Sequence, residues 1–299
     1  MQKTLDLSIK KAETGTLDGG YSVTDCKPYS SYMSNREWDA FVDDMQTNHR
    51  AAYIEYGAGS GGEMKPNGKY PPKMASYGSS SRMIYNLCRG NPNFHFEKKL
   101  PTKVGGTANL DGYMETEDTC YFVEAKCREP YGGKPHLIES KYKRLYEHIS
   151  GDPSVNLHIE TKDTDGKMSV AFSVENIIIS RFDIKQMICH LLGIACQFLS
   201  QPTDKKISFI YLCYNPKLIS IIDKDKEPLI YEAYDGMCAE CQAIDFKNLF
   251  ASIIRYLHFD LHIGHATEDE VSTAVNNFVF SLCDQDNCPT VLKLPPQKN

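Results

Sequence analysis

The sequence predicts an α/β fold in which a mixed central sheet is flanked by helices. Hydrophobic periodicity along the chain gives the order helix, three strands, helix, strand. The second helix carries a broad apolar stripe between residues 183 and 199. The last strand, residues 207–214, is a continuous apolar run of the kind that is covered on both faces. With additions at both ends, the 299 residues are expected to form one elaborated domain.

Composition limits the class of protein before any motif is considered. Hydrophobic residues make up 41% of the chain and charged residues 24%, the profile of a soluble globular protein. No window approaches the roughly 18 apolar residues of a spanning helix, and the first residues are too polar for a secretory signal, so we expect a cytoplasmic protein with no membrane partner. The eleven cysteines are expected to be mostly reduced and buried. A net charge of -6 argues against a uniformly basic nucleic-acid binder.

Residues 1–78 are predicted to form an N-terminal arm, a helix and a Gly-rich loop. The arm, residues 1–33, has few periodic apolar positions. Ser34 and Glu37 have the spacing of a capping box and begin the helix. Glycines and prolines between residues 57 and 72 indicate the loop.

Residues 79–299 carry the remaining elements, which we expect to form the main domain. Three strand-like segments separated by turn residues are close enough in sequence to form an antiparallel meander. Two further strands flank an Asp-Gly turn and predict a hairpin insertion at about 151–178. The predicted helices are 79–88, 183–199 and 246–258, and the predicted strands are 94–100, 108–114, 120–128, 157–161, 168–174 and 207–214.

Charged residues on the second and third strands form the most informative pattern. If the turn between these strands is centred on residues 117–118, Asp111 lies directly opposite Glu124, with side chains roughly 5 Å apart on one face. Because strand side chains alternate, Lys126 shares the face of Glu124 and Ala125 points away. The pattern therefore predicts two carboxylates and an ammonium group at one place.

Such a pair of carboxylates suits a divalent cation. Facing carboxylates repel each other or take up a proton, and a cation removes this conflict. Mg²⁺ prefers hard oxygen ligands, so we expect Asp111, Glu124 and the backbone carbonyl of Ala125 to bind Mg²⁺ or Mn²⁺. The ammonium of Lys126 would orient or activate water and offset negative charge in the transition state. These groups are equipped to hydrolyse a phosphodiester.

The pattern of Asp111 followed by Glu124-Ala125-Lys126 resembles the PD-(D/E)XK, or restriction endonuclease-like, nuclease superfamily. Each residue lies in the expected strand of a helix, three-strand meander, helix, strand core, and the resemblance covers about residues 79–215. It implies a restriction endonuclease-like fold and a Mg-dependent DNA endonuclease of restriction, defence or repair type. It also implies that Asp111, Glu124 and Lys126 are catalytic.

The superfamily tends to carry a polar residue at the start of the helix that follows the third strand. Lys185 and Gln186 stand at this position, and His190 follows one turn beyond Gln186. The resemblance implies that these residues touch substrate phosphate or the carboxylates. We expect Gln186 to assist catalysis and Lys185 to bind substrate.

A further acid is usual in the superfamily, commonly a glutamate on the first core helix. The helix predicted at 79–88 contains no carboxylate. Glu63 in the Gly-rich loop is the first candidate for this additional metal ligand, and Glu97 in the first strand is the second. The number of metal ions is therefore left open.

Basic residues are concentrated around the predicted site. Residues 98–144 contain nine Lys+Arg and seven Asp+Glu, whereas the rest of the chain contains 24 and 32. A local positive field of this kind favours binding of a nucleic-acid backbone, most simply that of DNA. Cutting both strands of a duplex often involves two copies of a site, so a homodimer is one expected form. The expected backbone contacts, besides Lys185, are Lys134, Lys141, Lys143 and Arg144.

Three alternatives stay open from the sequence. Because the helix glutamate is missing, the chain could be an inactive nucleic-acid-binding or assembly module on the same fold. The segment GAGSGG at 57–62 matches a dinucleotide-binding pattern after a strand-like segment at 51–56, although prolines follow where a helix would have to begin. Cysteines and histidines near the C-terminus could also assemble a structural zinc site. These residues are Cys238, Cys241, His258, His262, His265, Cys283 and Cys288.

Overall fold

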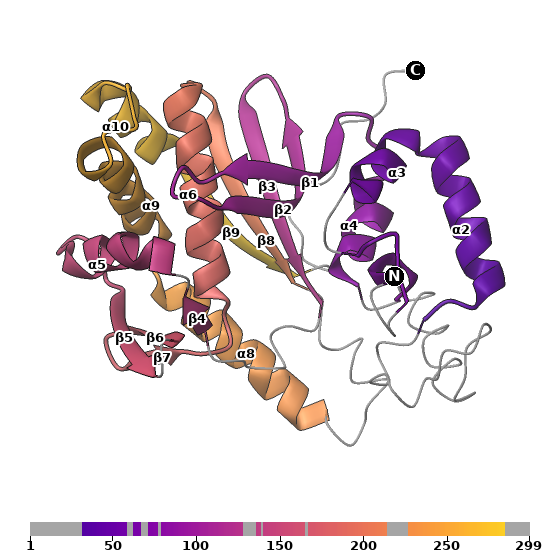
Figure 1. The fold of residues 1–299 in the computed structure, drawn as a ribbon, viewed down its shortest axis with the longest axis horizontal. Helices are drawn as coiled ribbons and strands as arrows, with labels where there is room; N and C mark the ends of the chain where they lie inside the picture. The colour runs from indigo at the N-terminus through magenta and orange to yellow at the C-terminus, as the bar shows by residue number, and fades with distance from the viewer. Residues whose placement is uncertain are drawn as a thin grey trace.

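The computed structural model describes residues 32–58, 62–66, 71–76, 79–127, 136–138, 140–164, 167–213 and 227–284. Almost all of the expected N-terminal arm, part of the Gly-rich loop, Lys134 and the C-terminal tail lie outside these ranges. Helices lie on both sides of one five-stranded sheet, and a second, smaller sheet lies near one end of it (Figure 1). The predicted α/β class with a mixed sheet flanked by helices is therefore confirmed.

The central sheet has the strand order β1-β2-β3-β8-β9. Strands β1 (Phe94–Pro101), β2 (Thr107–Glu115) and β3 (Thr119–Lys126) form the predicted antiparallel meander. Strand β8 (Lys206–Cys213) lies beside β3 and parallel to it, and its apolar run is buried in the interior of the sheet as predicted. Strand β9 (Phe278–Asp284), which the sequence analysis missed, pairs in parallel with β8.

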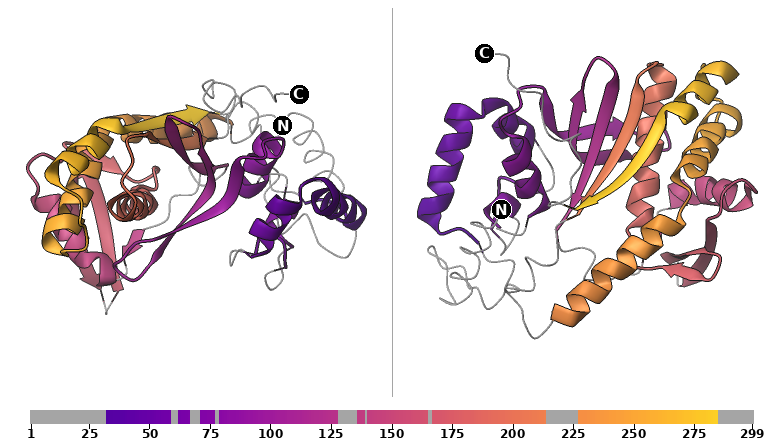
Figure 2. Two further views of the ribbon diagram at one scale, coloured as in Figure 1. Left: turned by 90° about the horizontal axis from the view of Figure 1, so that it is seen from above. Right: turned by 180° about the vertical axis from the view of Figure 1, so that it is seen from behind.

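Each face of the central sheet packs against its own hydrophobic core. Helices α6 (Ile184–Ser200) and α9 (Phe246–Arg255) cover one face, and α4 (Ser80–Cys88) covers the other (Figure 2). Alternation along β3 sends Phe122 into the α6 core and Val123 into the α4 core. The two faces of β3 therefore meet different helices, which decides which side chains can share a site.

Within the described residues, two α-helices precede α4. Helix α2 (Asn35–Asn48) begins with the predicted capping box. Helix α3 (Arg50–Gly57) shows that the strand-like reading of residues 51–56 was wrong. Ala52 and Tyr56, four residues apart, are buried on one side of this helix, and the Tyr56 hydroxyl donates to a backbone carbonyl of α4 at 2.9 Å. A short apolar run does not distinguish helix from strand, so these tertiary contacts decided the outcome.

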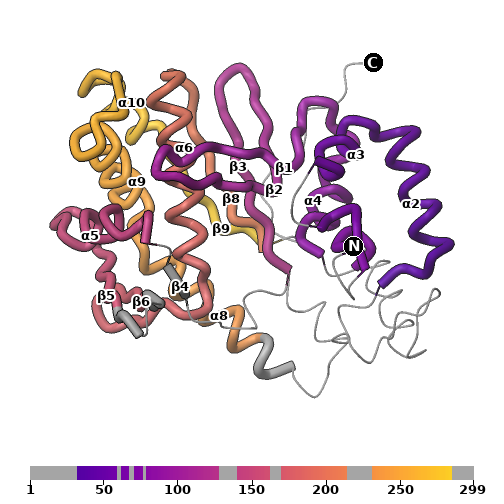
Figure 3. The backbone as a smooth tube through the Cα atoms, viewed as in Figure 1, coloured from indigo at the N-terminus to yellow at the C-terminus, as the bar shows by residue number. Residues whose placement is uncertain are grey.

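The smaller sheet is inserted between β3 and α6, as the tube in Figure 3 shows. The predicted hairpin is present as β5 (His158–Thr164) and β6 (Lys167–Val174). The short strands β4 (His136–Ile138) and β7 (Ile177–Ile179) also pair with β6. Before the hairpin, the 3-10 turn η5 (Ser140–Tyr142) leads into a helix that was not predicted. This helix, α5, covers Lys143–Gly151 and buries Leu145, Tyr146 and Ile149.

The C-terminal part contains further elements that the sequence analysis missed. These are α8 (Glu227–Ala243) and α10 (Glu268–Asn277). The helix predicted at 246–258 is divided, because α9 ends at Arg255 and a π-helical turn, η7 (Tyr256–Asp260), follows. The hydrophobic pattern does not reveal such a change in winding.

The cysteines of the described ranges are free thiols, and most of them are buried. Burial raises the pKa of Cys88 and of Cys196 to about 12, so both keep their protons. This agrees with the predicted reduced state for the described cysteines. Within the same ranges, no helix is long and apolar enough to cross a membrane.

Candidate active site between β3 and α6

The predicted catalytic residues meet where β3 ends and α6 begins. Glu124 and Lys126 lie on the α6 side of β3, while Ala125 between them belongs to the core on the α4 side. The parallel strands β3 and β8 both end here. In α/β folds the carboxyl ends of parallel strands are a common position for a functional site.

Glu124, Lys126 and Gln186 form a closed polar network. Nζ of Lys126 lies 2.7 Å from Oε1 of Glu124. Nε2 of Gln186 donates to the same oxygen at 2.9 Å, and Nζ of Lys126 donates to Oε1 of Gln186. Glu124 is 3% exposed and Lys126 is 6% exposed. Since burying two charges costs more than burying apolar side chains of the same size, packing alone does not explain this network.

The position of Gln186 follows from how α6 begins. Asp183 caps the helix by accepting a hydrogen bond through Oδ1 from the backbone N–H of Gln186 at 3.0 Å. The cap fixes the first turn of α6, and the Gln186 side chain reaches Glu124 on β3. The helix start at Asp183 was predicted, but the capping contact that positions Gln186 was not. Lys185, one residue earlier, is half-buried.

Asp111 lies at the point where the β2–β3 pairing ends. The register is the predicted one, since Gly112 pairs with Val123 and Glu115 with Cys120. Beyond Gly112, Oδ2 of Asp111 accepts a hydrogen bond from the backbone N–H of Ala125 at 2.8 Å. The Asp111 carboxylate is therefore next to the Glu124-Ala125 peptide, with one oxygen held by a protein donor.

Glu97, the second candidate for the additional acid, lies across β1 from Asp111. The pairs on either side of it, Phe96 with Gly112 and Lys98 with Leu110, place it opposite Asp111. Its φ of 54° is in the left-handed region, which a residue other than glycine rarely adopts. Such backbone strain is concentrated at functional sites.

The electrostatics of Glu97 show that carboxylates are crowded here. Burial, followed by the negative charges of Glu63 and Asp111, raises the pKa of Glu97 to about 8. Lys73 lowers this pKa, and Glu124 raises it further. Glu97 therefore shares one electrostatic environment with the other acidic candidates.

Glu63, the first candidate, is buried beside this group. Oε1 of Glu63 lies 3.3 Å from Nζ of Lys73. Its other carboxylate oxygen, Oε2, is buried and has no hydrogen-bond partner among the residues that the structure describes. Lys73 was not predicted, and no periodic signal could have found it because it lies in the short 3-10 turn η3 (Lys73–Ala75). Both acids left open by the sequence thus belong to this region.

His190 completes the side of the network formed by α6. It lies one turn beyond Gln186, so both side chains face Glu124. Nδ1 of His190 lies 3.8 Å from Oε2 of Glu124, and the imidazole is 2% exposed. Burial, followed by the charge of Lys126, lowers the pKa of His190 to about 3. The ring is therefore neutral.

The donor chemistry of this region fits a divalent cation. Three other acidic side chains raise the pKa of Glu97, namely Glu63, Asp111 and Glu124. Lys73 and Lys126 are the cations that neighbour them. Hard oxygen atoms are the ligands that Mg²⁺ and Mn²⁺ prefer, and one of those in this region, Oε2 of Glu63, is buried without a partner among the described residues. In their present positions, no three His, Cys, Asp or Glu side chains of the described ranges form a group that could hold an ion, so binding requires side chains to move.

Three of the predicted substrate-binding cations, Lys141, Lys143 and Arg144, lie on a separate segment, η5 and α5. Lys141 is exposed and lies 5.2 Å from the centre of the Tyr142 ring. Arg144 is also exposed, and Lys143 forms an i,i+4 ion pair with Glu147 at 3.8 Å. The structure therefore does not place these side chains in the Glu124–Lys126 network, although their exposure suits contacts with phosphate. Lys134 lies outside the described residues.

The dinucleotide-binding and zinc alternatives gain no support from the geometry of the described residues. The Gly-rich segment follows helix α3 and not a strand, so the strand context of a dinucleotide site is missing. Cys238 and Cys241 lie on α8, where Cys241 is buried and burial raises its pKa. The described cysteines and histidines form no cluster of three suited to a metal, and Cys288 lies outside the described ranges.

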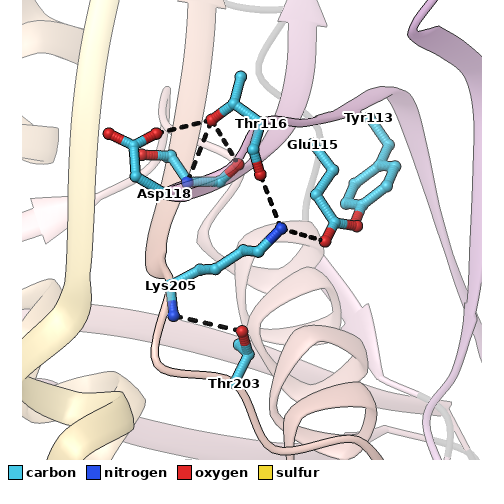
Figure 4. Close-up of polar contacts among 7 residues, drawn as sticks. Tyr113, Glu115, Thr116, Asp118, Thr203 and Lys205 are labelled. Atoms are coloured by element: carbon cyan, nitrogen blue, oxygen red, sulfur yellow. Dashed lines mark hydrogen bonds and ion pairs between the residues drawn. The ribbon is translucent and has the colours of Figure 1, made fainter.

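A second ion pair lies at the opposite end of β3 and β8 (Figure 4). Nζ of Lys205 lies 2.7 Å from Oε1 of Glu115 and donates to the backbone carbonyl of Thr116 at 2.7 Å. This hydrogen bond from Lys205 lowers the pKa of Glu115. The contacts tie the β2–β3 turn to the chain just before β8, and both side chains are partly exposed to solvent.

Comparison with protein-family models, curated proteins and solved structures found no match to this chain. Fold alone does not determine function, because one fold can carry many different sites. A function is therefore best argued from the residues that meet between β3 and α6.

Proposed function

We propose that this protein is a metal-dependent nuclease of the PD-(D/E)XK type that hydrolyses phosphodiester bonds, most simply in DNA. The observation that carries the proposal is the buried network of Glu124, Lys126 and Gln186 beside Asp111. These are the residues that the sequence motif selects. The order of α4, the β1–β3 meander, α6 and β8 supports a restriction endonuclease-like core as the finer description of the fold.

The carboxylates would hold Mg²⁺ or Mn²⁺. Asp111, Glu124 and the backbone carbonyl of Ala125 would be its ligands, joined by Glu63 or Glu97. The cation would supply Lewis-acid stabilisation of a phosphate oxygen. The unpartnered oxygen of Glu63 and the raised pKa of Glu97 support the need for additional positive charge.

Lys126 and Gln186 would act on water and on charge. Nζ of Lys126 would transfer its hydrogen bonds from Glu124 to the attacking water and to the phosphate oxygens, where negative charge develops. Gln186, held by the cap of α6, would keep Glu124 and Lys126 in position. Lys141, Arg144 and other exposed cations would bind the nucleic-acid backbone.

An inactive module that binds nucleic acid on the same fold is the second candidate. It is favoured by the contacts that the carboxylates already make. Oε1 of Glu124 accepts from Gln186 and pairs with Lys126, and Asp111 accepts from the Ala125 backbone. In such a module these contacts would be permanent and the network would only stabilise the fold.

Cleavage of plasmid and single-stranded DNA by the purified full chain separates the two candidates. We expect cleavage that requires Mg²⁺ or Mn²⁺ and falls at least about 100-fold in Lys126→Ala, because a charge-stabilising group is lost. Lys205→Ala is the matched control, since it removes an ion pair of the same length without touching the network. Binding without cleavage would favour the module. Cleavage that persists in Lys126→Ala would show that the activity comes from elsewhere.

A further inference from the structure

His190 is a buried polar residue that has no part in the proposed reaction. Its imidazole is 2% exposed, and Nδ1 has no hydrogen-bond partner among the residues that the structure describes. The nearest acidic atom is Oε2 of Glu124, at 3.8 Å. This distance is too long for a hydrogen bond. An unpartnered buried nitrogen is costly unless a ligand satisfies it.

The hydrogen bonding of His190 defines what Nδ1 offers. The imidazole makes a hydrogen bond with the Asn109 backbone. Since Nδ1 has no hydrogen-bond partner within the described part of the chain, this hydrogen bond belongs to the other ring nitrogen, which then carries the proton. Nδ1 is left with a lone pair, 3.8 Å from a carboxylate oxygen of Glu124. A metal ion is one partner that could satisfy this buried nitrogen while also binding a carboxylate.

We infer that Nδ1 of His190 is a ligand of the metal ion, together with Glu124. This inference rests on the proposed function, because it adds a nitrogen ligand to the same site. Two ligand atoms that are each about 2.1 Å from an ion can lie up to about 4.2 Å apart, and the observed separation of 3.8 Å is within that span. His190 and Glu124 therefore already provide two ligands without moving, and Asp111 would supply a third.

A nitrogen ligand changes which ion the site prefers. Imidazole suits first-row transition-metal ions, whereas Mg²⁺ favours sites made of oxygen atoms alone. The site is therefore expected to bind a transition-metal ion such as Mn²⁺ more tightly than Mg²⁺. This specifies the cofactor class that the carboxylates by themselves leave open.

Electron spin-echo spectroscopy of bound Mn²⁺ tests the inference directly, because it detects a nitrogen bonded to the ion. We expect ¹⁴N coupling in the wild-type chain titrated with Mn²⁺, and its loss in His190→Gln with at least about 10-fold weaker Mn²⁺ binding. His258→Gln is the matched control. His258 also has a buried Nδ1 without a partner among the described residues, but it lies in η7. This control variant should keep both the coupling and the affinity.

A second variant separates ligation from a merely structural role. His190→Asn places an amide oxygen near the position of Nδ1, so it should bind Mn²⁺ without ¹⁴N coupling and with a lower ratio of Mn²⁺ to Mg²⁺ affinity. A structural role would leave this ratio unchanged, which would overturn the inference. Mn²⁺ bound to the wild-type chain without nitrogen coupling would also overturn it, while DNA cleavage would still support the proposed function. A chain that neither binds Mn²⁺ nor cleaves DNA would overturn both.

Discussion

The two ends of strands β3 and β8 carry ion pairs of the same length in different surroundings. Lys126 and Glu124 are 2.7 Å apart with side chains 7% and 4% exposed. Lys205 and Glu115 are also 2.7 Å apart, but their side chains are 29% and 48% exposed. Solvent screens the exposed pair, and forming it costs little. The buried pair forms only after both charges have lost most of their water.

The length of an ion pair therefore does not by itself mark a functional site. Around Lys205 and Glu115, the further contacts come from the same β2–β3 hairpin: the backbone carbonyl of Thr116 accepts from Lys205, and the Tyr113 hydroxyl donates to Glu115 at 2.6 Å. Around Glu124, two further side chains of α6, Gln186 and His190, come close to the carboxylate. A buried charged group with several polar neighbours from different elements is typical of a functional site. We therefore assign the chemistry to the end of β3 and β8 that carries Glu124.

The largest expected difference between the two pairs concerns stability. Lys126→Met leaves Glu124 buried with an uncompensated charge, so we expect the free energy of unfolding to fall by about 3 kcal/mol or more. Lys205→Met should lower it by no more than about 1 kcal/mol. Urea unfolding followed by circular dichroism, without added metal, measures both values. Equal losses in the two variants would remove the distinction between the pairs.

A double variant shows whether the buried pair serves stability at all. Glu124→Gln combined with Lys126→Met removes both charges, and replacing a buried pair is often neutral or stabilising. We therefore expect stability near that of the wild type together with complete loss of DNA cleavage. A double variant as unstable as Lys126→Met would mean that the network is needed for the fold.

The pH dependence of stability should have opposite signs at the two ends. The pKa of Glu97 is raised from 4.5 to about 8, so its contribution is present below pH 4.5 and is lost as the pH rises through 8. The pKa of Glu115 is lowered, so its contribution is present above pH 4.5 and is lost as the pH falls. Urea midpoints of the metal-free chain between pH 3 and 9 measure both trends.

Matched glutamine variants assign each trend to one carboxyl group. Glu97→Gln should remove most of the loss of stability between about pH 5 and 8, and Glu115→Gln should leave that range unchanged. The Glu115→Gln variant should instead flatten the acid side of the profile. If the wild-type midpoint does not fall between pH 5 and 8, Glu97 is not in the crowded environment described here.

The smallest effects are expected for the exposed cations of α5 and η5, which resemble Lys205 in their exposure. Replacing Lys141, Lys143 or Arg144 by Gln should not change stability measurably. Each replacement should weaken DNA binding several-fold and reduce the slope of log affinity against log salt by about one. Fluorescence anisotropy at several salt concentrations measures this slope, with Lys205→Gln as the control. An unchanged slope in all three variants would exclude this segment from the DNA interface.

Most of the central fold could be predicted because its signals are local. The capping box at Ser34, the apolar stripe of α6 and the continuous apolar run of β8 each identify an element within a short window. The elements that were missed have short or irregular apolar patterns. Helix α3 is the clearest case, because its assignment depends on the burial of Tyr56 against α4, far away in sequence.

The face of β3 that carries Glu124 and Lys126 and the residues that begin α6 follow from local sequence, because alternation and helix capping depend on neighbouring residues. The packing of the folded chain, by contrast, brings Glu63, Glu97 and His190 beside them. Their positions depend on a loop, on a strained φ and on the packing of α6 over the sheet. Contacts between distant segments form only when the helices pack on the sheet, and these contacts cause the desolvation. No pattern within one segment therefore predicts them.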